Sequence, residues 1–192
     1  MPLEGKHGLV RADKALTAPI KNEEEIYTMK NETKIYGAYG SNMNINQMSY
    51  RCPNAKVIGT GKLKNYRLTF RGINNGVANI EKRQGSTVPI VLWEITAQCE
   101  KALDIYEGYP KLYIKEEVEV ATKNGTIKAM VYIMAKDYEE LPAKPTNRYL
   151  NIIWQGYHDN KIPLRVLREA IAENVREISD LDNKRFNFKH FK

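Results

Sequence analysis

Cysteine and histidine are scarce in this chain of 192 residues, which has two cysteines and three histidines. Cys52 and Cys99 form no C-x-x-C pair and are too few for a disulfide framework, which favours a protein of the reducing cytoplasm. His7, His158 and His190 lie far apart, so a Ser-His-Asp triad lacks an obvious base. A zinc site is not expected for the same reason, and we predict neither a metal nor a cofactor.

Long hydrophobic runs are also missing. No stretch approaches the ~20 apolar residues that a membrane-spanning helix needs, and the first residues lack the apolar core of a secretion signal. Ser41 lacks the second glycine of a G-x-S-x-G elbow, and no helix is expected after Gly59-Thr60-Gly61-Lys62, as a phosphate loop requires. We expect a soluble cytoplasmic protein without a membrane partner, whose chemistry rests on carboxylates, hydroxyls and backbone groups.

Charge, by contrast, is abundant, with a formal net value of +7. The lysines and arginines are spread along the chain and many alternate with acids, and no RNP-like, zinc-finger or helix-turn-helix pattern accompanies them. We therefore favour a solvated basic surface over a nucleic-acid partner. Residues 184–192 interleave basic and aromatic side chains, as a single-strand or interfacial binder does; the alternative is a strand or docked tail that covers apolar surface.

The chain divides into three predicted parts. Residues 1–32 are polar and weakly patterned, with one possible short helix, and are interpreted as an N-terminal extension: a docking arm or a loosely ordered tail. Residues 33–180 carry the ordered domain, and residues 181–192 form a basic aromatic tail.

Apolar spacing and turn residues predict the elements of the domain. Because the strands are contiguous rather than interleaved with helices, we predict an α+β fold with a small closed or strongly curved, antiparallel or mixed sheet and flanking helices. The predicted strands are 34–40, a long or bent strand over 55–70, 76–80 and 87–95 joined by a turn at 84–86, and a hairpin of 112–122 and 126–135 around Asn124-Gly125; the predicted helices are 44–51, capped by Asn44, 96–106, capped by Thr96, 148–157 and 163–178.

The turn Tyr39-Gly40-Ser41-Asn42 is the first candidate for a binding site. A glycine followed by Ser and Asn between a strand and a helix exposes several backbone N–H groups in a small concavity, and the helix N-terminus adds positive potential. Such a nest suits a carboxylate or a developing oxyanion. The alternative is an ordinary tight turn in which Asn is a cap.

Glu107 is the candidate proton-transfer group. It follows a predicted helix and precedes Gly108, a typical C-terminal stop, where a carboxylate opposes the helix dipole. Desolvation by the flanking Tyr106 and Tyr109 is expected to raise its pKa towards the ~6–7 that suits acid–base catalysis. The alternative is a solvated loop glutamate.

Together these residues resemble a known family. The segment Tyr36-Gly37-Ala38-Tyr39-Gly40-Ser41-Asn42, followed in order by Glu107-Gly108, Tyr113 and Tyr149, is similar to the signature of the γ-glutamylcyclotransferase-like family, and the resemblance covers about residues 34–178. It implies a small closed sheet with a cavity at one mouth and a γ-glutamyl or 5-oxoproline group held by Tyr39, Gly40, Ser41 and Asn42. It also implies that Glu107 is the acid/base and that Tyr113 and Tyr149 line the pocket. The stretch 107–113 resembles the shorter version of bacterial members.

Two functions follow as hypotheses. The first is an enzyme that converts a γ-glutamyl amide to 5-oxoproline and a free amine, with Glu107 as acid and base and no metal. The second is a non-catalytic binding or regulatory module of the same fold that recognises γ-glutamyl or other acidic groups. The sequence leaves open the leaving amine, whether the substrate is free or carrier-bound, and whether the protein is a monomer or a homodimer.

Overall fold

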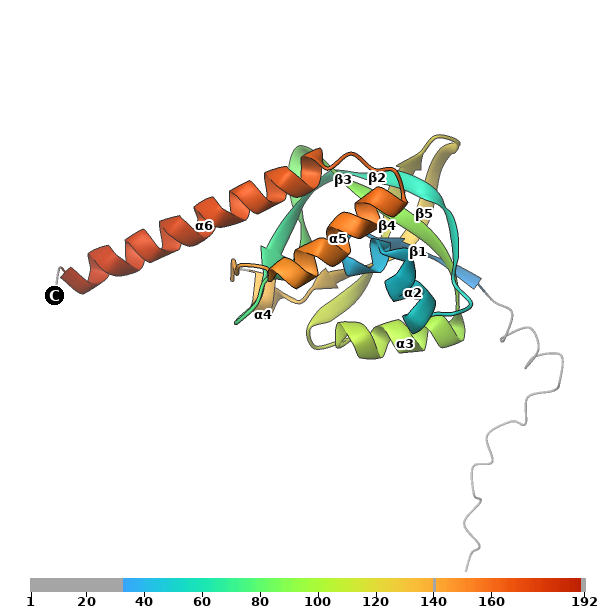
Figure 1. The fold of residues 1–192 in the computed structure, drawn as a ribbon, viewed down its shortest axis with the longest axis horizontal. Helices are drawn as coiled ribbons and strands as arrows, with labels where there is room; N and C mark the ends of the chain where they lie inside the picture. The colour runs from blue at the N-terminus through green and yellow to red at the C-terminus, as the bar shows by residue number, and fades with distance from the viewer. Residues whose placement is uncertain (1–32, 140, 191–192) are drawn as a thin grey trace, which may run out of the picture.

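The structure, a computed structural model, describes residues 33–139 and 141–190. The N-terminal extension and the short helix predicted in it lie outside the described residues. Figure 1 shows a β-barrel with helices packed around it and one long helix that projects away from it.

Five strands close into a mixed barrel, which confirms the predicted fold class. Neighbouring strands are antiparallel except β1 and β5, which run parallel where Tyr36 meets Met130. Closure leaves no exposed sheet edge in the barrel. The strand order around the barrel is β1 (Thr33–Ala38), β3 (Val77–Thr96), β2 (Lys56–Arg71), β4 (Tyr113–Thr122) and β5 (Gly125–Met134).

The strand β3 corrects one prediction, because the two strands predicted over 76–80 and 87–95 form one continuous strand, Val77–Thr96. The predicted turn at 84–86 is an irregularity in the β2–β3 ladder, where the register shifts between Lys64 and Tyr66. Gly85 takes a positive φ of 80°, and its N–H donates to Asn65 Oδ1 at 3.1 Å. Turn residues therefore produce a bulge here, and bulges bend and twist a strand as barrel closure requires.

The interior of the barrel is apolar. The β3 run from Val88 to Ile95, predicted to be central, supplies several fully buried side chains, and β2, β4 and β5 face it. The predicted β4–β5 hairpin is confirmed, with Thr122 opposite Gly125 and a φ of 119° at that glycine. The largest fully buried side chains of the molecule include Phe70, Ile80, Ile90, Ile95 and Met134, and strand alternation divides them between the two faces of the sheet.

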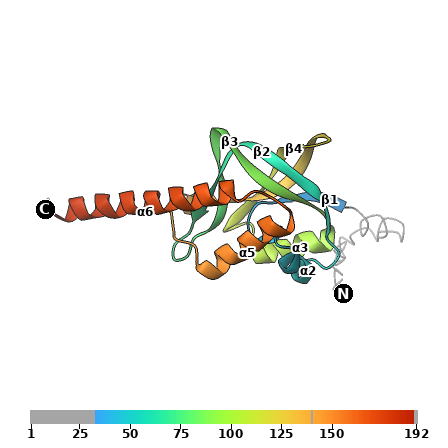
Figure 2. The same cartoon turned by 45° about the horizontal axis from the view of Figure 1, so that its top comes forward.

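Short helices gather on one side of the barrel, where α2 and α3 lie next to each other and α5 lies against η1 (Figures 1 and 2). Asn44 and Thr96 cap α2 and α3 as predicted, by accepting from the N–H groups of Gln47 and Cys99. The helices are the 3-10 helix η1 (Ser41–Met43), α2 (Ile45–Arg51), α3 (Ala97–Glu107), α4 (Lys136–Glu139), α5 (Asn147–Asp159) and α6 (Arg165–His190).

The final helix is longer than predicted. The sequence indicates an end near residue 178, but α6 continues through His190, so the predicted boundary at 180 falls inside one helix (Figures 1 and 2). No glycine or proline follows Pro163, so nothing local stops the helix from propagating. None of the helices that the structure describes combines the length and the apolar character needed to cross a membrane.

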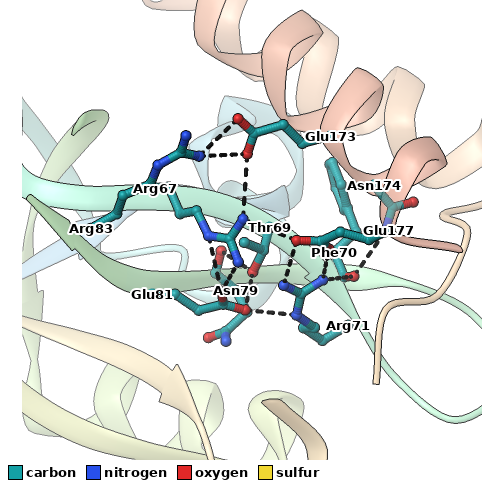
Figure 3. A network of polar contacts seen from close by, with 10 residues as sticks. All are labelled: Arg67, Thr69, Phe70, Arg71, Asn79, Glu81, Arg83, Glu173, Asn174 and Glu177. Carbon is teal, nitrogen blue, oxygen red and sulfur yellow. Dashed lines mark hydrogen bonds and ion pairs between the residues drawn. The ribbon is translucent and has the colours of Figure 1, made fainter. Parts of the chain in front are cut away.

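A charged network joins the first half of α6 to the barrel. Figure 3 shows Arg67 and Arg71 of β2 between Glu81 of β3 and the α6 carboxylates of Glu173 and Glu177. Leu167, Ala170 and Asn174 of the same helix face are buried, and Asn174 Nδ2 donates to the Phe70 carbonyl at 3.0 Å.

Candidate functional site

The candidate site is a cavity of about 290 Å³, counted with its open mouth, where the barrel wall meets α3, α5 and η1. All seven residues predicted for the site line it, although they extend from position 39 to position 149 of the chain. The structure therefore brings them together, while their roles remain predictions. The lining residues are Tyr36, Tyr39, Gly40, Ser41, Asn42, Ala78, Glu107, Tyr113, Tyr132 and Tyr149.

The turn after β1 forms one wall. Ser41 begins the 3-10 turn η1, which lies between the strand and α2, and α2 starts after its Asn44 cap as predicted. Ser41 and Asn42 are buried. Gly40 is needed for space, because a Cβ there would lie 3.0 Å from the Cβ of Ala78 and 3.5 Å from the Tyr149 hydroxyl. The glycine thus lets backbone approach the cavity.

Glu107 forms the opposite wall as the last residue of α3. The helix stops at Gly108, which is left-handed as a C-cap should be (φ 66°, ψ 33°). The carboxylate Oε1 accepts from Asn42 Nδ2 at 2.7 Å. Burial raises the pKa of Glu107 to about 7, against the opposing effects of the Asn42 hydrogen bond and the Arg51 charge. The predicted elevation of the pKa therefore appears in the structure.

Burial is the cause, as predicted, but the residues that line the cavity around the carboxyl are not the two that flank it in the sequence. Tyr106 and Tyr109 are 46% and 42% exposed, and neither lines the cavity. Tyr109 follows the end of the helix, and Tyr106 lies at the edge of the site, with its hydroxyl 3.3 Å from Ser41 Oγ and its ring against Arg51. The phenol walls around the carboxylate come from the strands, the turn and α5, whose meeting point is set by the barrel and not by nearby sequence.

Two tyrosine hydroxyls bracket one backbone unit of β3. Tyr113 donates to the Ala78 carbonyl at 2.6 Å, and Tyr149 accepts from the Ala78 N–H at 3.1 Å. Tyr39 donates to the Tyr132 carbonyl. Tyr39 and Tyr113 therefore present lone pairs to a ligand, while Tyr149 keeps a proton to donate. Burial raises the pKa of all three phenols, so they stay neutral near pH 7.

Sequence reasoning did not place Tyr36, Ala78 or Tyr132 in the site. Tyr36 belongs to the opening motif, and its position on a strand that leads into the turn is a signal that could have found it. Ala78 and Tyr132 reach the cavity through strand register, which pairs residues far apart in the sequence. Tyr132 also fixes α3, since its hydroxyl donates to Asp104 Oδ1 at 2.6 Å, one turn before Glu107.

The arrangement is suited to moving a proton in an enclosed space. A carboxyl with a pKa of about 7 exists in both forms at neutral pH, and hydroxyl donors, hydroxyl acceptors and backbone surround it. Among residues 33–137 and 141–183, whose side chains the structure describes, no group of three or more His, Cys, Asp or Glu is placed to hold a metal ion.

Comparison with known proteins gives this site a context. Residues 36–151 match the model of the family described as gamma-glutamyl cyclotransferase, AIG2-like. The human γ-glutamylcyclotransferase is 32% identical over 143 residues, which are 69% of this chain and 74% of the relative. The mouse γ-glutamylcyclotransferase is 30% identical over 142 residues, with the same two shares. These relatives are mammalian, so they give no support to the bacterial-type assignment.

A solved structure agrees with the sequence relatives. A γ-glutamyl cyclotransferase structure is 30% identical, has a TM-score of 0.65, and covers 72% of this chain and 86% of its own. This homology suggests an enzyme of that kind. The matched segment contains the cavity-lining turn, Glu107, Tyr113 and Tyr149. The chain belongs to the γ-glutamyl cyclotransferase, AIG2-like family.

Proposed function

We propose that this chain is a γ-glutamyl cyclotransferase that converts a γ-glutamyl amide to 5-oxoproline and a free amine, with Glu107 as acid and base. The observation that carries the proposal is the Glu107 carboxyl, which faces the Tyr39–Asn42 turn across the cavity and has a pKa raised to about 7. A surface glutamate titrates about two units lower and is a weaker base at neutral pH.

The reaction needs one bond to form and one to break. The α-amine nitrogen of the γ-glutamyl group attacks the γ-carbonyl carbon, and the new C–N bond closes a five-membered ring. Glu107 takes one proton from the α-ammonium and delivers it to the leaving nitrogen as the γ-amide C–N bond breaks. The second proton, which the ring nitrogen loses on becoming an amide, protonates the released amine. No water, oxidant or covalent enzyme intermediate is required.

Positioning supplies much of the acceleration. The amine and the carbonyl belong to one molecule, so holding the reactive rotamer contributes several kcal/mol. In this proposal the hydroxyl lone pairs of Tyr39 and Tyr113 accept from the α-ammonium. The N–H groups of the turn hold either the α-carboxylate or the oxyanion, and Ser41 is a hydrogen-bond donor rather than a nucleophile.

The test is Glu107→Gln, which keeps the size of the side chain and removes its basicity. We expect release of 5-oxoproline from γ-glutamyl amides to fall at least ~100-fold. Binding of 5-oxoproline, measured by calorimetry, should change little. The matched control is Glu119→Gln on the exposed face of β4, which should keep wild-type turnover.

The substrate set decides between the two hypotheses. It contains γ-glutamyl dipeptides, γ-glutamyl polyamines and a peptide with a γ-glutamyl lysine side chain. Wild-type release of 5-oxoproline from any of them supports the enzyme and identifies the class of amine. Tight binding of 5-oxoproline without turnover of any amide would favour the binding module, and full activity of Glu107→Gln would remove the acid/base role.

A further inference from the structure

Arg51, the last residue of α2, is held beside the cavity by three contacts. One guanidinium nitrogen, Nη1, donates to Asn42 Oδ1 at 2.6 Å, and the other, Nη2, donates to Gln47 Oε1 at 2.7 Å. The Cζ atom lies 3.6 Å from the centroid of the Tyr106 ring, in cation–π geometry. Hydrogen bonds therefore fix both terminal nitrogens of the guanidinium, and the Tyr106 ring covers one face of its plane.

These contacts determine which way the Asn42 amide points. Arginine has donors and no acceptor, so the oxygen of Asn42 must face Arg51. The amide nitrogen then faces the cavity, where it donates to Glu107 Oε1 at 2.7 Å and to the Tyr36 hydroxyl at 2.8 Å. A flipped amide would place N–H groups against the guanidinium and an oxygen against the carboxylate, which is repulsive on both sides.

The orientation of Asn42 has a consequence for proton transfer. Oε1 of Glu107 is engaged as an acceptor, so the other oxygen, Oε2, is the one free to exchange a proton. Tyr36 accepts from the same amide nitrogen, which leaves the Tyr36 proton free to point elsewhere. The two hydrogens of the Asn42 amide nitrogen are both used.

We propose that Arg51 is a positioning residue for Glu107, acting through Asn42: it fixes the amide that holds Oε1 and so presents Oε2 to the substrate. The turnover part of this inference rests on the proposed function, whereas the effect on the Glu107 carboxyl does not. Arg51 makes no hydrogen bond to Glu107 and does not itself line the cavity; its contacts are Asn42, Gln47 and Tyr106.

The groups around Glu107 allow a titration to be interpreted. Arg51 and the Asn42 hydrogen bond both lower the pKa of Glu107 against the effect of burial. Asp104, one turn earlier on α3, is paired with Lys115 and accepts from a tyrosine hydroxyl. The remaining groups that face the carboxyl are phenols with raised pKa values, which stay neutral at neutral pH: Tyr36, Tyr39, Tyr113, Tyr132 and Tyr149.

The experiment compares two variants. Arg51→Met removes both the positive charge and the pair of guanidinium donors, whereas Arg51→Lys keeps the charge and loses the pair of donors. The Glu107 carboxyl is titrated by carbon-13 NMR, and kcat and KM are measured across the pH range. For Arg51→Met we expect the titration midpoint to rise by about one unit, and kcat to fall about ten- to hundredfold. For Arg51→Lys the midpoint should move less, while kcat falls similarly because the two-pronged geometry is lost.

A double-mutant cycle separates positioning from general damage. In an Asn42→Ala background, Arg51→Met should lower kcat no further, because the amide that connects Arg51 to Glu107 is already missing. The matched control is Arg168→Met, which removes an exposed positive charge from α6 and should leave both the midpoint and kcat unchanged.

The outcomes are distinct from those of the function test. A wild-type midpoint and kcat in Arg51→Met would overturn the inference while leaving the cyclotransferase proposal intact. Additive losses in the cycle would also overturn it, since Arg51 would then act by another route. If the wild type turns over no amide, the NMR midpoint alone still decides whether Arg51 and Asn42 control the Glu107 carboxyl.

Discussion

Glu107 combines two features that each disfavour its charged form: it stands at the C-terminal end of α3, and its carboxyl is buried in the cavity wall. The hydrogen bond from Asn42 and the nearby charge of Arg51 offset part of this cost. The part of the cost that these two groups do not offset lowers the free energy of unfolding, and it accompanies a carboxyl whose pKa is near 7. A side chain placed so unfavourably for stability is typical of a functional group.

The stability cost predicts a pH-dependent effect of Glu107→Gln. The folded-state pKa of about 7 exceeds the ordinary 4.5, so between these values the folded protein holds a proton that the unfolded chain has released. The wild type therefore loses stability as pH rises through this window, and the variant does not. We expect the free energy of unfolding of the variant to exceed that of the wild type by up to about 3 kcal/mol at about pH 8. This difference should vanish near about pH 4.5.

Urea unfolding of both proteins at several pH values measures this difference. Glu119→Gln, whose side chain is exposed on β4, should show almost no difference at any pH. A Glu107→Gln gain that is equal at low and high pH would contradict a raised pKa as its origin.

At the scale of elements, α5 shapes the cavity by resting on the turn that forms its wall. A Cβ at Gly156 would lie 2.8 Å from the backbone of Met43 and of Asn44, closer than real Cβ atoms approach. Asn160 Nδ2 donates to the Met43 carbonyl at 2.9 Å, and Asn44 Nδ2 donates to the Ile152 carbonyl at 3.3 Å. The helix and the turn therefore form one unit, and α5 also carries Tyr149.

Gly156→Ala is expected to push α5 away from the turn that it packs against. The methyl group meets backbone, which has little freedom to move, so we expect a loss of about 1–3 kcal/mol of unfolding free energy. The displaced turn should also weaken 5-oxoproline binding, measured by calorimetry. Asn151→Ala, on an exposed position of the same helix, is the matched control and should keep both properties. Unchanged stability and binding in Gly156→Ala would show that α5 can shift without moving the turn.

At the scale of the whole molecule, the α6 network joins the longest helix to the barrel at a distance from the cavity. Arg71 is 4% exposed and pairs with Glu81 of β3 and Glu177 of α6, whereas Arg83 is about half exposed and pairs with Glu173. A buried ion pair and an exposed ion pair differ in how much the loss of one partner lowers the free energy of unfolding. Removing one partner of a buried pair leaves an uncompensated charge, whereas an exposed pair contributes little.

Arg71→Met should therefore destabilise the protein by about 3–5 kcal/mol, and Arg83→Met by less than about 1 kcal/mol. Thermal and urea unfolding measure both. Glu177 has a pKa lowered by Arg71, so its contribution is present above its ordinary titration range and is lost as the pH falls. The Arg71→Met deficit should accordingly shrink in acid, and equal effects of the two substitutions would exclude a special role for the buried pair.

Much of this protein followed from local sequence. The alternation of β4 and β5 around Asn124-Gly125, the caps Asn44 and Thr96, and the stop at Gly108 are each decided within a few residues, and each was predicted. The motif of residues 36–42 predicted the family, and with it the closed sheet and a cavity lined by the turn and Glu107. The hairpin, the two caps and the helix stop depend on backbone preferences and short-range hydrogen bonds among a few neighbouring residues, whereas the closed sheet and the cavity were expected from the family resemblance.

Other features were decided only by tertiary structure. The turn signal at Gly85 became a bulge because a neighbouring strand continues alongside it. The walls around Glu107 are Tyr36, Tyr132 and other residues that strand register brings from far along the chain. Register and barrel closure depend on long-range pairing, so the sequence by itself identified the candidate groups for the chemistry, and the fold decided what surrounds them.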